Sequence, residues 1–209
     1  MATRVSDAVI RRLPRYYRQL NVLRQDGVDR ISSLALSRLL NITASQIRQD
    51  LSCFGGFGQQ GYGYNVSELI RHIAEILGID REYRMIILGA GNIGQALSGY
   101  TRFAAEGYHI LALFDANPAL AGKTVGGVSV LHVNEMEGFV SENNVDIAVL
   151  AVPAFAARGL AERLQKLKIK AIWNFTPVEI VLEGVAVENV QLTDGLMALT
   201  YRLGELKKS

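Results

Sequence analysis

The chain is poor in several residue types that commonly form disulfides, metal sites and catalytic sites. Its 209 residues include one cysteine, Cys53, one tryptophan and three histidines. A lone cysteine excludes disulfide frameworks and cysteine-rich zinc sites, and it is typical of the reducing cytoplasm, where we expect the chain. The longest nearly unbroken apolar run, residues 147–157, spans eleven residues and contains Pro153, whereas a membrane helix needs about 20. We therefore expect no membrane span, and the first 20 residues lack the apolar stretch of a secretory signal.

Lysine is absent from the first 60 residues, although this part of the chain is strongly basic. Residues 1–60 hold nine arginines and four acidic residues, a net charge of +5, whereas residues 85–209 have a net charge of −2. A DNA-binding domain joined to a ligand-binding domain would show this asymmetry, but a solvated arginine surface explains the charge equally well. The apolar fraction of 49% is enough for the cores of two small domains.

Helical spacing predicts three helices in the N-terminal part. Residues 6–23 form the first, in which Pro14 either causes a kink or begins a second half. Residues 33–40 form the second, with Leu36, Leu39 and Leu40 directed inward. Residues 43–46 (TASQ) have the form of a capping box, in which the first and last side chains cap each other's backbone amides. A third helix should begin there.

The third predicted helix has one apolar and one hydrogen-bonding face. Ile47, Leu51 and Phe54 repeat at helical spacing. The opposite face holds Ser45, Arg48, Gln49 and Ser52. Such side chains bond base edges and phosphates in a major groove, so this pair of helices favours a helix-turn-helix over an ordinary helical hairpin. We interpret Asp50, next to the apolar stripe, as the internal partner of an arginine.

A segment rich in glycine and aromatic residues follows, at residues 55–64. It predicts a β-hairpin, the wing of a winged helix, which can enter a minor groove. A linker helix over residues 65–78 and a boundary near residues 79–84 complete a winged-helix DNA-binding domain over residues 1–80. The candidate DNA contacts are Arg12, Ser45, Gln46, Arg48, Gln49, Ser52, Phe57, Gln59, Gln60 and Tyr62.

A glycine loop of the form GxGxxG, residues 89–94, follows a short apolar strand at residues 85–88 and leads into a helix predicted over residues 93–105. The glycines permit a tight turn and close approach of the backbone to a pyrophosphate at the helix N-terminus. The next strand ends in Asp115, 21 residues beyond Gly94. A carboxylate there accepts hydrogen bonds from ribose hydroxyls and repels a 2′-phosphate, so NAD⁺ and NADH are favoured over their phosphorylated forms.

Strands and helices then alternate, which predicts a Rossmann-like parallel sheet of the α/β class over residues 81–192. The expected strands are residues 128–131, 146–152 and 170–175, and the expected helices are residues 134–141 and 154–167. Ligands bind beyond the carboxyl ends of such strands. The candidate cofactor contacts are Gly89, Ala90, Gly91, Asn92, Ile93, Gly94, Tyr100, Asp115, Val152, Pro153, Asn174, Phe175, Thr176 and Pro177. A last helix over residues 193–207 has leucines at heptad-like spacing, and it covers its own sheet or docks on another subunit.

The sequence gives little support for catalysis. A dehydrogenase needs a proton donor or acceptor beside the nicotinamide and a substrate pocket, yet His72, His109 and His132 lie on a linker helix, at a strand start and on a loop. No metal-ligand cluster or glycine-flanked nucleophilic serine is present. We therefore expect a regulator that is not an enzyme. The alternatives are a small NAD-dependent oxidoreductase with a basic N-terminal extension, and an interaction module that retains a nucleotide fold.

These motifs together resemble the Rex family of redox-sensing transcriptional repressors over nearly the whole chain. The similarity is carried by residues 12–18 (RLPRYYR), 47–52 (IRQDLS), 61–65 (GYGYN), the glycine loop and residues 174–177 (NFTP). The resemblance implies a homodimer that binds double-stranded operator DNA with an inverted repeat when NAD⁺ prevails and releases it when NADH accumulates. It also implies that the C-terminal helix, residues 193–209, is exchanged between subunits, that Tyr100 lies near the nicotinamide, and that Arg18 and Asp194 belong to the interface that rearranges.

The chain departs from the Rex pattern in its DNA-binding part, because Gln49, Gln59 and Gln60 stand where many relatives carry basic residues. Fewer phosphate contacts should make DNA binding less sensitive to salt. The redox response has a simple physical basis, since the oxidised ring carries a positive charge that an apolar pocket disfavours. NADH then selects one dimer geometry, and operator affinity falls if that geometry moves the two recognition helices away from a spacing of about 34 Å.

Overall fold

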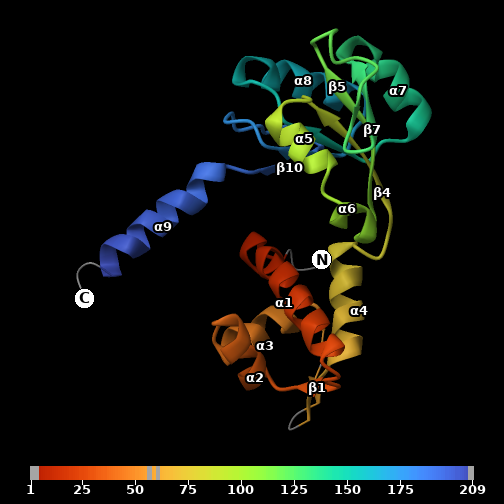
Figure 1. The fold of residues 1–209 in the computed structure, drawn as a ribbon. Coiled ribbons are helices and arrows are strands. Elements are labelled where there is room, and N and C mark those ends of the chain that lie inside the picture. Colours follow the sequence, from red (N-terminus) through yellow and green to blue (C-terminus); the bar gives the residue numbers. More distant parts are fainter. Residues whose placement is uncertain (1–4, 56–57, 60–61, 207–209) are drawn as a thin grey trace. The chain divides into compact units, whose positions relative to one another are not determined.

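The computed structural model describes residues 5–55, 58–59 and 62–206 (Figure 1). The chain divides into two compact units, residues 1–81 and 82–209, each of which is described by itself. No helix in the described part of the chain is long and apolar enough to cross a membrane.

The N-terminal unit consists of helices around a small antiparallel sheet. Its elements are α1 (Asp7–Gln25), β1 (Arg30–Ile31), α2 (Ser33–Leu40), α3 (Ala44–Ser52), β2 (Gly58–Gln59), β3 (Gly63–Asn65) and α4 (Val66–Leu77). Pro14 lies inside α1 without ending it. Asn41, in the left-handed conformation at φ 53°, ends α2 and begins the short turn to α3. The helix-turn-helix and the linker helix are therefore present as predicted.

The apolar stripes of these helices meet in one core. Leu13, Leu20, Leu36 and Ile47 are fully buried in a cluster that also includes Ile73 of α4. Leu39, expected to face inward, is 51% exposed, so this prediction is wrong. Leu36 and Leu40, one turn apart, occupy the buried face of α2, and Leu39, about 100° from Leu40 around the helix axis, lies at the edge of that face.

The wing is a three-stranded sheet in the order β1-β3-β2, and both pairs of strands are antiparallel. The sequence did not indicate β1, which is only two residues long. Gly63 has φ +70°, and a Cβ atom there would lie 2.6 Å from the carbonyl oxygen of Ile31, so glycine is needed where β1 and β3 approach. Phe57 and Gln60, and the side chain of Gln59, lie outside the described residues.

The C-terminal unit is a Rossmann-like α/β domain with a mostly parallel sheet. Its elements are β4 (Tyr83–Leu88), α5 (Asn92–Ser98), α6 (Arg102–Ala105), β5 (Tyr108–Asp115), β6 (Thr124–Val125), β7 (Val128–His132), η1 (Val133–Glu135), α7 (Met136–Asn143), β8 (Ile147–Leu150), α8 (Ala154–Lys166), β9 (Ala171–Asn174), β10 (Ala186–Asn189) and α9 (Leu192–Leu206). The strand order is β10-β9-β8-β4-β5-β7-β6, and only β6 is antiparallel to its neighbour. The order reverses between β4 and β8, where such sheets bind ligands.

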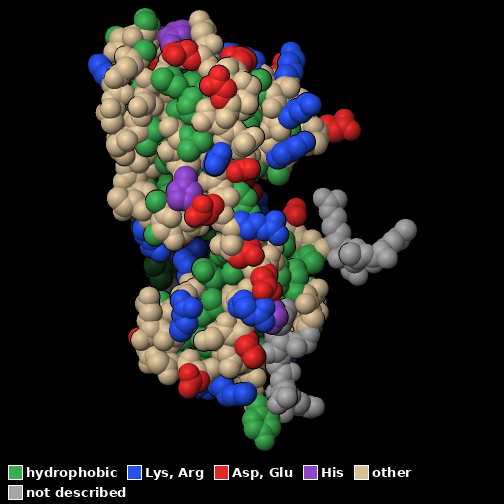
Figure 2. All heavy atoms as spheres, turned by 90° about the vertical axis from the view of Figure 1, so that its right-hand side faces the viewer, with side chains coloured by type: hydrophobic (Ala, Val, Ile, Leu, Met, Phe, Trp, Pro, Cys, Tyr) green, Lys and Arg blue, Asp and Glu red, His purple; other side chains and the backbone are tan. Residues whose placement is uncertain are grey.

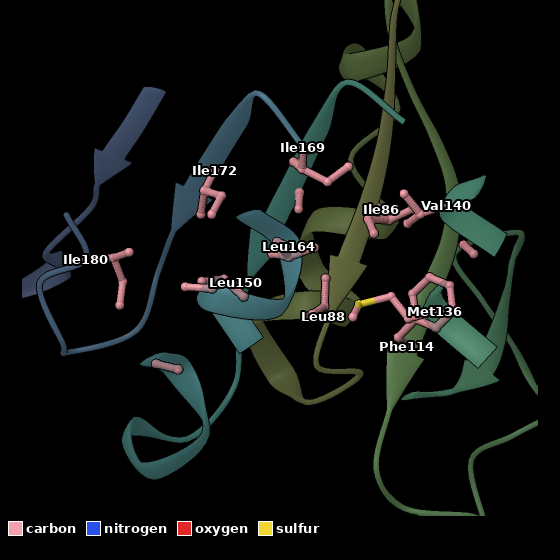
Figure 3. Close-up of a cluster of buried hydrophobic side chains, with 14 residues drawn as sticks. Ile86, Leu88, Phe114, Met136, Val140, Leu150, Leu164, Ile169, Ile172 and Ile180 are labelled. Atoms are coloured by element: carbon pink, nitrogen blue, oxygen red, sulfur yellow. The ribbon is translucent and has the colours of Figure 1, made fainter. Parts of the chain in front are cut away.

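Side chains alternate between the two faces of this sheet. Ile86, Leu88 and Leu150 lie on the face covered by α7 and α8, as Figure 3 shows. Met85 and Ile87 lie on the opposite face, where Leu97 of α5 packs. A continuous parallel sheet therefore carries the glycine loop at the end of its central strand, β4.

The structure differs from the sequence-based prediction at three places in this unit. The helix expected over residues 93–105 is broken into α5 and α6 at Gly99, a residue that weakens helices because it gains much backbone freedom in the unfolded chain. The helix expected from residue 134 begins with the 3-10 turn η1. The strands β6 and β10 lack the strongly apolar pattern of the inner strands and were not expected.

The last helix, α9, has an apolar face that its own unit does not cover. None of its described residues is buried. The exposed apolar side chains are Leu192, Leu196, Met197, Leu199, Tyr201, Leu203 and Leu206. Of the two roles expected for this helix, covering its own sheet is therefore wrong.

Candidate functional site

The glycine loop is shaped by two close backbone contacts. Gly89 has φ +102°, and a Cβ atom there would lie 2.3 Å from the carbonyl oxygen of Ala151. A Cβ atom on Gly94 would lie 1.9 Å from the carbonyl oxygen of Gly89. A side chain at Gly89 would push the loop away from the end of β8. A side chain at Gly94 would push α5 away from the end of β4. These two glycines therefore fix the turn itself.

Gly91, the middle glycine of the loop, has a different environment. It precedes the first residue of α5, and a Cβ atom there would meet nothing within 4 Å. The protein thus leaves open space beside this backbone, where a ligand phosphate can approach the amide groups at the start of the helix. The side-chain amide of Gln95 donates to the carbonyl oxygen of Ala90 at 2.8 Å and holds the loop from the helix side.

Asp115 lies at the end of β5, next to the glycine loop. Its Oδ2 accepts a hydrogen bond from the amide of Ala90 at 2.8 Å, and its Oδ1 accepts one from the amide of Asn117 at 2.8 Å. The carboxylate is only partly buried. It is therefore held in place and still has lone pairs for the hydroxyls of a ribose, whereas a 2′-phosphate would be repelled.

The remaining candidate cofactor residues follow neighbouring strands at the same edge of the sheet. Val152 and Pro153 follow β8, and residues 174–177 follow β9. Backbone hydrogen bonds continue beyond the strands, from the amide of Ala151 to Leu88 and from that of Phe175 to Leu150. The structure thus brings the glycine loop, Asp115 and the ends of β8 and β9 to one edge, as the sequence indicated.

Asn174 and Thr176 use their side chains to shape the loop after β9. Asn174 is fully buried, and its amide donates to the carbonyl oxygen of Val178 and to Oδ1 of Asn189, both at 2.7 Å. Its Oδ1 accepts hydrogen bonds from the backbone amide and the hydroxyl of Thr176. These side chains have no group left for a ligand, so ligand contacts from this loop would come from its backbone or from Phe175.

Aromatic side chains form a connected row on the α5 face of the sheet. Tyr100 packs edge-on against Phe103, with ring centroids 4.8 Å apart. Phe103 in turn contacts Trp173, and Trp173 contacts Phe175 at 4.5 Å. Tyr100 remains 48% exposed, so its ring packs on one side and is accessible on the other. Both roles considered for Tyr100, packing and contact with a ligand ring, are compatible with this geometry.

The residues present fit a dinucleotide. Gly91 offers open backbone for the pyrophosphate, Asp115 offers a carboxylate for the adenosine ribose, and the aromatic row offers an apolar surface near the end of β9. The described residues contain no cluster of side chains that could hold a metal ion. The edge is therefore equipped to bind a dinucleotide.

The recognition helix α3 begins with a true cap but not with the complete capping box. Thr43 Oγ1 accepts the amide of Gln46 at 3.2 Å, as expected. The side chain of Gln46 does not return to the backbone of Thr43, because its Nε2 donates instead to Oδ1 of Asp50 at 2.8 Å. In the complete box the side-chain oxygen of Gln46 would accept the amide of Thr43, but the side chain is turned toward Asp50, whose charge strengthens the hydrogen bond from its amide group.

Asp50 is fully buried and lies at the centre of a hydrogen-bonded network with α1. Arg12 donates from Nε to Oδ2 at 2.6 Å and from Nη2 to Oδ1 at 2.7 Å, and Tyr16 donates to Oδ2 at 2.6 Å. Burial alone would raise the pKa of Asp50, but the hydrogen bonds from Arg12, Tyr16 and Gln46 outweigh it and lower that pKa. The interpretation of Asp50 as the internal partner of an arginine is therefore confirmed.

The other polar residues of α3 are accessible. Ser45, Arg48, Gln49 and Ser52 are exposed. Arg48 donates from Nη1 to Oγ of Ser33 at 3.0 Å, which orients its guanidinium group. On the wing, Tyr62 is 70% exposed. Acidic and basic side chains are interspersed on the face of the molecule seen in Figure 2.

Several partners of the site residues were not apparent from the sequence. Ser33 contacts Arg48 from another helix, and Asn189 holds Asn174 from the unexpected strand β10. These contacts join residues 15 apart, for which no local spacing rule exists. The hydrogen bond from Tyr16 to Asp50 was not expected either, although a buried tyrosine hydroxyl usually has a hydrogen-bond partner. Arg18 and Asp194 are both exposed, each within its own unit.

Two family models match the chain. The model described as "CoA binding domain" matches residues 80–178, and the one described as "Putative DNA-binding protein N-terminus" matches residues 4–52. With the helix-turn-helix, the wing and the dinucleotide edge, they define the class: a DNA-binding protein that carries a Rossmann-type nucleotide-binding domain.

Curated relatives identify the family. The redox-sensing transcriptional repressor Rex of Caldanaerobacter subterraneus subsp. tengcongensis is 52% identical over 204 residues, which cover 97% of this chain and 91% of that protein. Rex of Clostridium botulinum strain Hall is 52% identical over 197 residues, 94% of each chain. The chain belongs to the Rex family of redox-sensing transcriptional repressors.

Solved structures agree with this assignment and with the expected fold. The structure described as RSP in complex with beta-NAD+ and operator DNA has a TM-score of 0.92 and 50% identity, covering 98% of this chain and 95% of that one. RSP in complex with beta-NADH has a TM-score of 0.90 and 48% identity, covering 98% and 97%. The relatives are named as repressors, which confirms the expectation of a regulator and argues against the oxidoreductase alternative.

Proposed function

We propose that this chain is a cytoplasmic repressor that binds an inverted-repeat operator as a homodimer and releases it when NADH binds. The observation that carries the proposal is the presence, in one chain, of an accessible recognition helix and an edge that fits a dinucleotide. Relatives at about 50% identity have been solved with beta-NAD+ and operator DNA and with beta-NADH, over nearly the same length.

The proposed cofactor contacts follow the edge of the sheet. Residues 89–94 hold the pyrophosphate, and Asp115 accepts the ribose hydroxyls. Val152, Pro153 and the loop at residues 174–177 line the nicotinamide half, and Tyr100 contacts the ring from the aromatic row. NAD⁺ and NADH act as effectors here, since the bound dinucleotide changes an equilibrium between two forms of the protein.

The proposed DNA contacts come from the accessible residues of α3 and from the wing. Ser45, Arg48, Gln49 and Ser52 face the major groove, and the wing residues Phe57, Gln59, Gln60 and Tyr62 approach the minor groove. Arg48, oriented by Ser33, has donors left for a guanine edge or a phosphate. Three glutamines in place of basic residues make this surface less dependent on counterion release than a lysine-rich one.

The apolar face of α9 supports a homodimer. Seven exposed apolar side chains on one helix form a surface that water disfavours, and a second copy of this chain offers an equivalent helix for a twofold interface. We propose that α9 is exchanged between the subunits, and that Arg18 and Asp194 belong to the interface that changes with the redox state. The helix would thereby connect cofactor binding in one subunit to the geometry of the dimer.

The coupling needs only a modest free energy. The reduced ring is neutral, so an apolar pocket favours it over the positively charged oxidised ring, and the dimer form that keeps this pocket closed is favoured with it. A difference of about 3 kcal/mol changes operator affinity by more than a hundredfold. Reciprocity requires that operator DNA weaken NADH binding by the same factor.

A titration of operator binding at several NADH:NAD⁺ ratios tests the proposal. The probe is a labelled duplex selected from a random-sequence library with the wild-type chain, and fluorescence anisotropy follows the complex. We expect an inverted-repeat sequence and an affinity that falls as the NADH fraction rises. Equal affinity with saturating NADH and with saturating NAD⁺ would contradict the redox response, and failure to select any sequence would contradict specific DNA binding.

A further inference from the structure

A buried carboxylate joins the recognition helix to the first helix of the chain. Asp50 of α3 accepts four hydrogen bonds, of which two come from Arg12 and one from Tyr16, both on α1. The fourth comes from Gln46, one turn earlier on α3. Asp50 is fully buried, whereas the side chain of Arg12 is 26% exposed, so the bonds strengthen because water has little access to the carboxylate itself.

In this network the positive charge of Arg12 is paired with the negative charge of Asp50. Its guanidinium group forms a two-pronged pair with the carboxylate, the geometry in which arginine and carboxylate bind most strongly. An arginine whose charge is matched by a carboxylate contributes little attraction for a phosphate. The sequence suggests Arg12 and Gln46 as DNA contacts, whereas in the structure both donate to Asp50.

The same bonds restrict the orientation of α3. Apolar packing of Ile47 and Leu51 holds the helix against the core but permits small rotations, because such contacts have no preferred direction. Hydrogen bonds to Asp50 are directional and remove that freedom. Arg48, the proposed base contact, has a separate hydrogen bond to Ser33 of α2. Its side chain is therefore held by α2, whereas Asp50 is held by α1.

We propose that Asp50 is a positioning residue, which holds α3 on α1 in the orientation needed to bind DNA, and that Arg12 acts on operator binding through Asp50 without contacting DNA. The proposal rests on the proposed repressor function, since it concerns how the operator is bound. It assigns the pair a role in the specificity of the recognition helix and removes Arg12 and Gln46 from the set of direct contacts.

The dependence of operator binding on salt distinguishes positioning from direct contact. Each phosphate neutralised by a protein cation contributes about 0.9 to the slope of log K against log salt concentration. We expect Arg12→Gln to weaken binding of the selected duplex by about tenfold or more while this slope stays at the wild-type value. A slope lower by about 0.9 per subunit would overturn the proposal, because it would show a lost phosphate contact.

Variants of the other network members test whether the pair acts as a unit. Asp50→Asn should weaken operator binding about as much as Arg12→Gln, and the double variant should be no weaker than the worse single variant, because both changes remove one interaction. Tyr16→Phe removes a single hydrogen bond and keeps the packing of the ring, so it should give a smaller loss in a folded protein. Additive losses in the double variant, or wild-type binding by Asp50→Asn, would contradict a positioning role.

Two controls separate this inference from loss of folding and from failure of the proposed function. Arg24→Gln changes an exposed arginine of α1 whose guanidinium group donates to Asn21 of the same helix, and it should bind the duplex like the wild type. Each variant should keep its circular dichroism and its NADH affinity, which belongs to the other unit. If the wild type binds its selected duplex but the network variants do so equally well, the inference fails while the repressor function stands.

Discussion

At the residue scale, the carboxylate of Asp115 has two tasks. It holds the amide of Ala90 in the glycine loop, and in the proposed function it accepts hydrogen bonds from the ribose hydroxyls. We expect Asp115→Ala to weaken NADH binding roughly 10- to 100-fold, the effect of losing hydrogen bonds to a charged group. Titration calorimetry checks this, and the preference for NADH over NADPH should decrease at the same time because the repulsion of a 2′-phosphate is removed. Unchanged NADH affinity would contradict the assignment.

Arg48 is the residue of α3 whose removal should affect the operator most directly. A bidentate contact to a base contributes about 1–3 kcal/mol, and a homodimer uses the residue twice, so Arg48→Ala should weaken operator binding roughly 30-fold or more. NADH affinity should remain at the wild-type value, since the cofactor edge belongs to the other unit. Anisotropy and calorimetry on the same preparation provide both numbers. Loss of NADH binding would contradict the separation of the two sites.

The stability of the N-terminal unit should decrease in acid because of Asp50. Hydrogen bonds lower its folded-state pKa below the unfolded value of about 3.9, so its contribution is complete above pH 4 and is lost as pH falls through the folded-state pKa. Asp50→Asn leaves the partly exposed Arg12 without its charged partner and should cost about 1.5–3 kcal/mol at neutral pH. It should also flatten the decline of the melting temperature in acid, as measured by scanning calorimetry.

Glu137 provides a matched control for this acid dependence. Partial burial raises its pKa, but hydrogen bonds from Arg163 lower it further than burial raises it. The two side chains are 36% and 45% exposed, so solvent screens the pair and Glu137→Gln should change stability by less than about 1 kcal/mol. An acid profile that is the same for Asp50→Asn and the wild type would contradict the role of the buried pair.

At the element scale, different glycines of the loop are needed for folding and for binding of the dinucleotide. A Cβ atom on Gly94 would collide with backbone, whereas one on Gly91 would enter open space. We therefore expect Gly91→Ala to keep the melting temperature and to weaken NADH binding at least about tenfold by occupying the space of the pyrophosphate. Gly99→Ala is the control, since its backbone suits alanine, and it should retain NADH binding and stabilise the fold by about 0.4–1 kcal/mol.

Elements with a strong local signal were predicted correctly from the sequence. The helix at residues 33–40 has a serine before it and an asparagine after it, and the strands leading to Leu88 and Asp115 are apolar and followed by turns. The failures have a common physical origin. The strands β1, β6 and β10 exist because of their partners in a sheet, and the bonds from Asn189 and Ser33 join distant residues. The edge that fits the dinucleotide was predictable because parallel strands bring their carboxyl ends together.

At the scale of the whole molecule, the apolar face of α9 should determine the oligomeric state. Leu196→Ser combined with Leu203→Ser places hydroxyls seven residues apart on that face and affects four side chains in a dimer. With about 1.5–3 kcal/mol lost per buried leucine, dimer dissociation should increase by at least about a hundredfold. Sedimentation equilibrium measures this, with Val181→Ser as the control at an exposed apolar residue outside α9. A double variant that stays fully dimeric would contradict the proposed interface.

Trp173 is the one tryptophan of the chain, and its ring contacts that of Phe175 at the end of β9. All tryptophan fluorescence of the protein therefore originates beside the edge proposed for the nicotinamide. Reduced nicotinamide absorbs in the range where indole emits, and the oxidised form does not. We expect NADH bound at the proposed edge to quench the emission of Trp173 more than NAD⁺ does, so this emission would report occupancy by the reduced form without any dye.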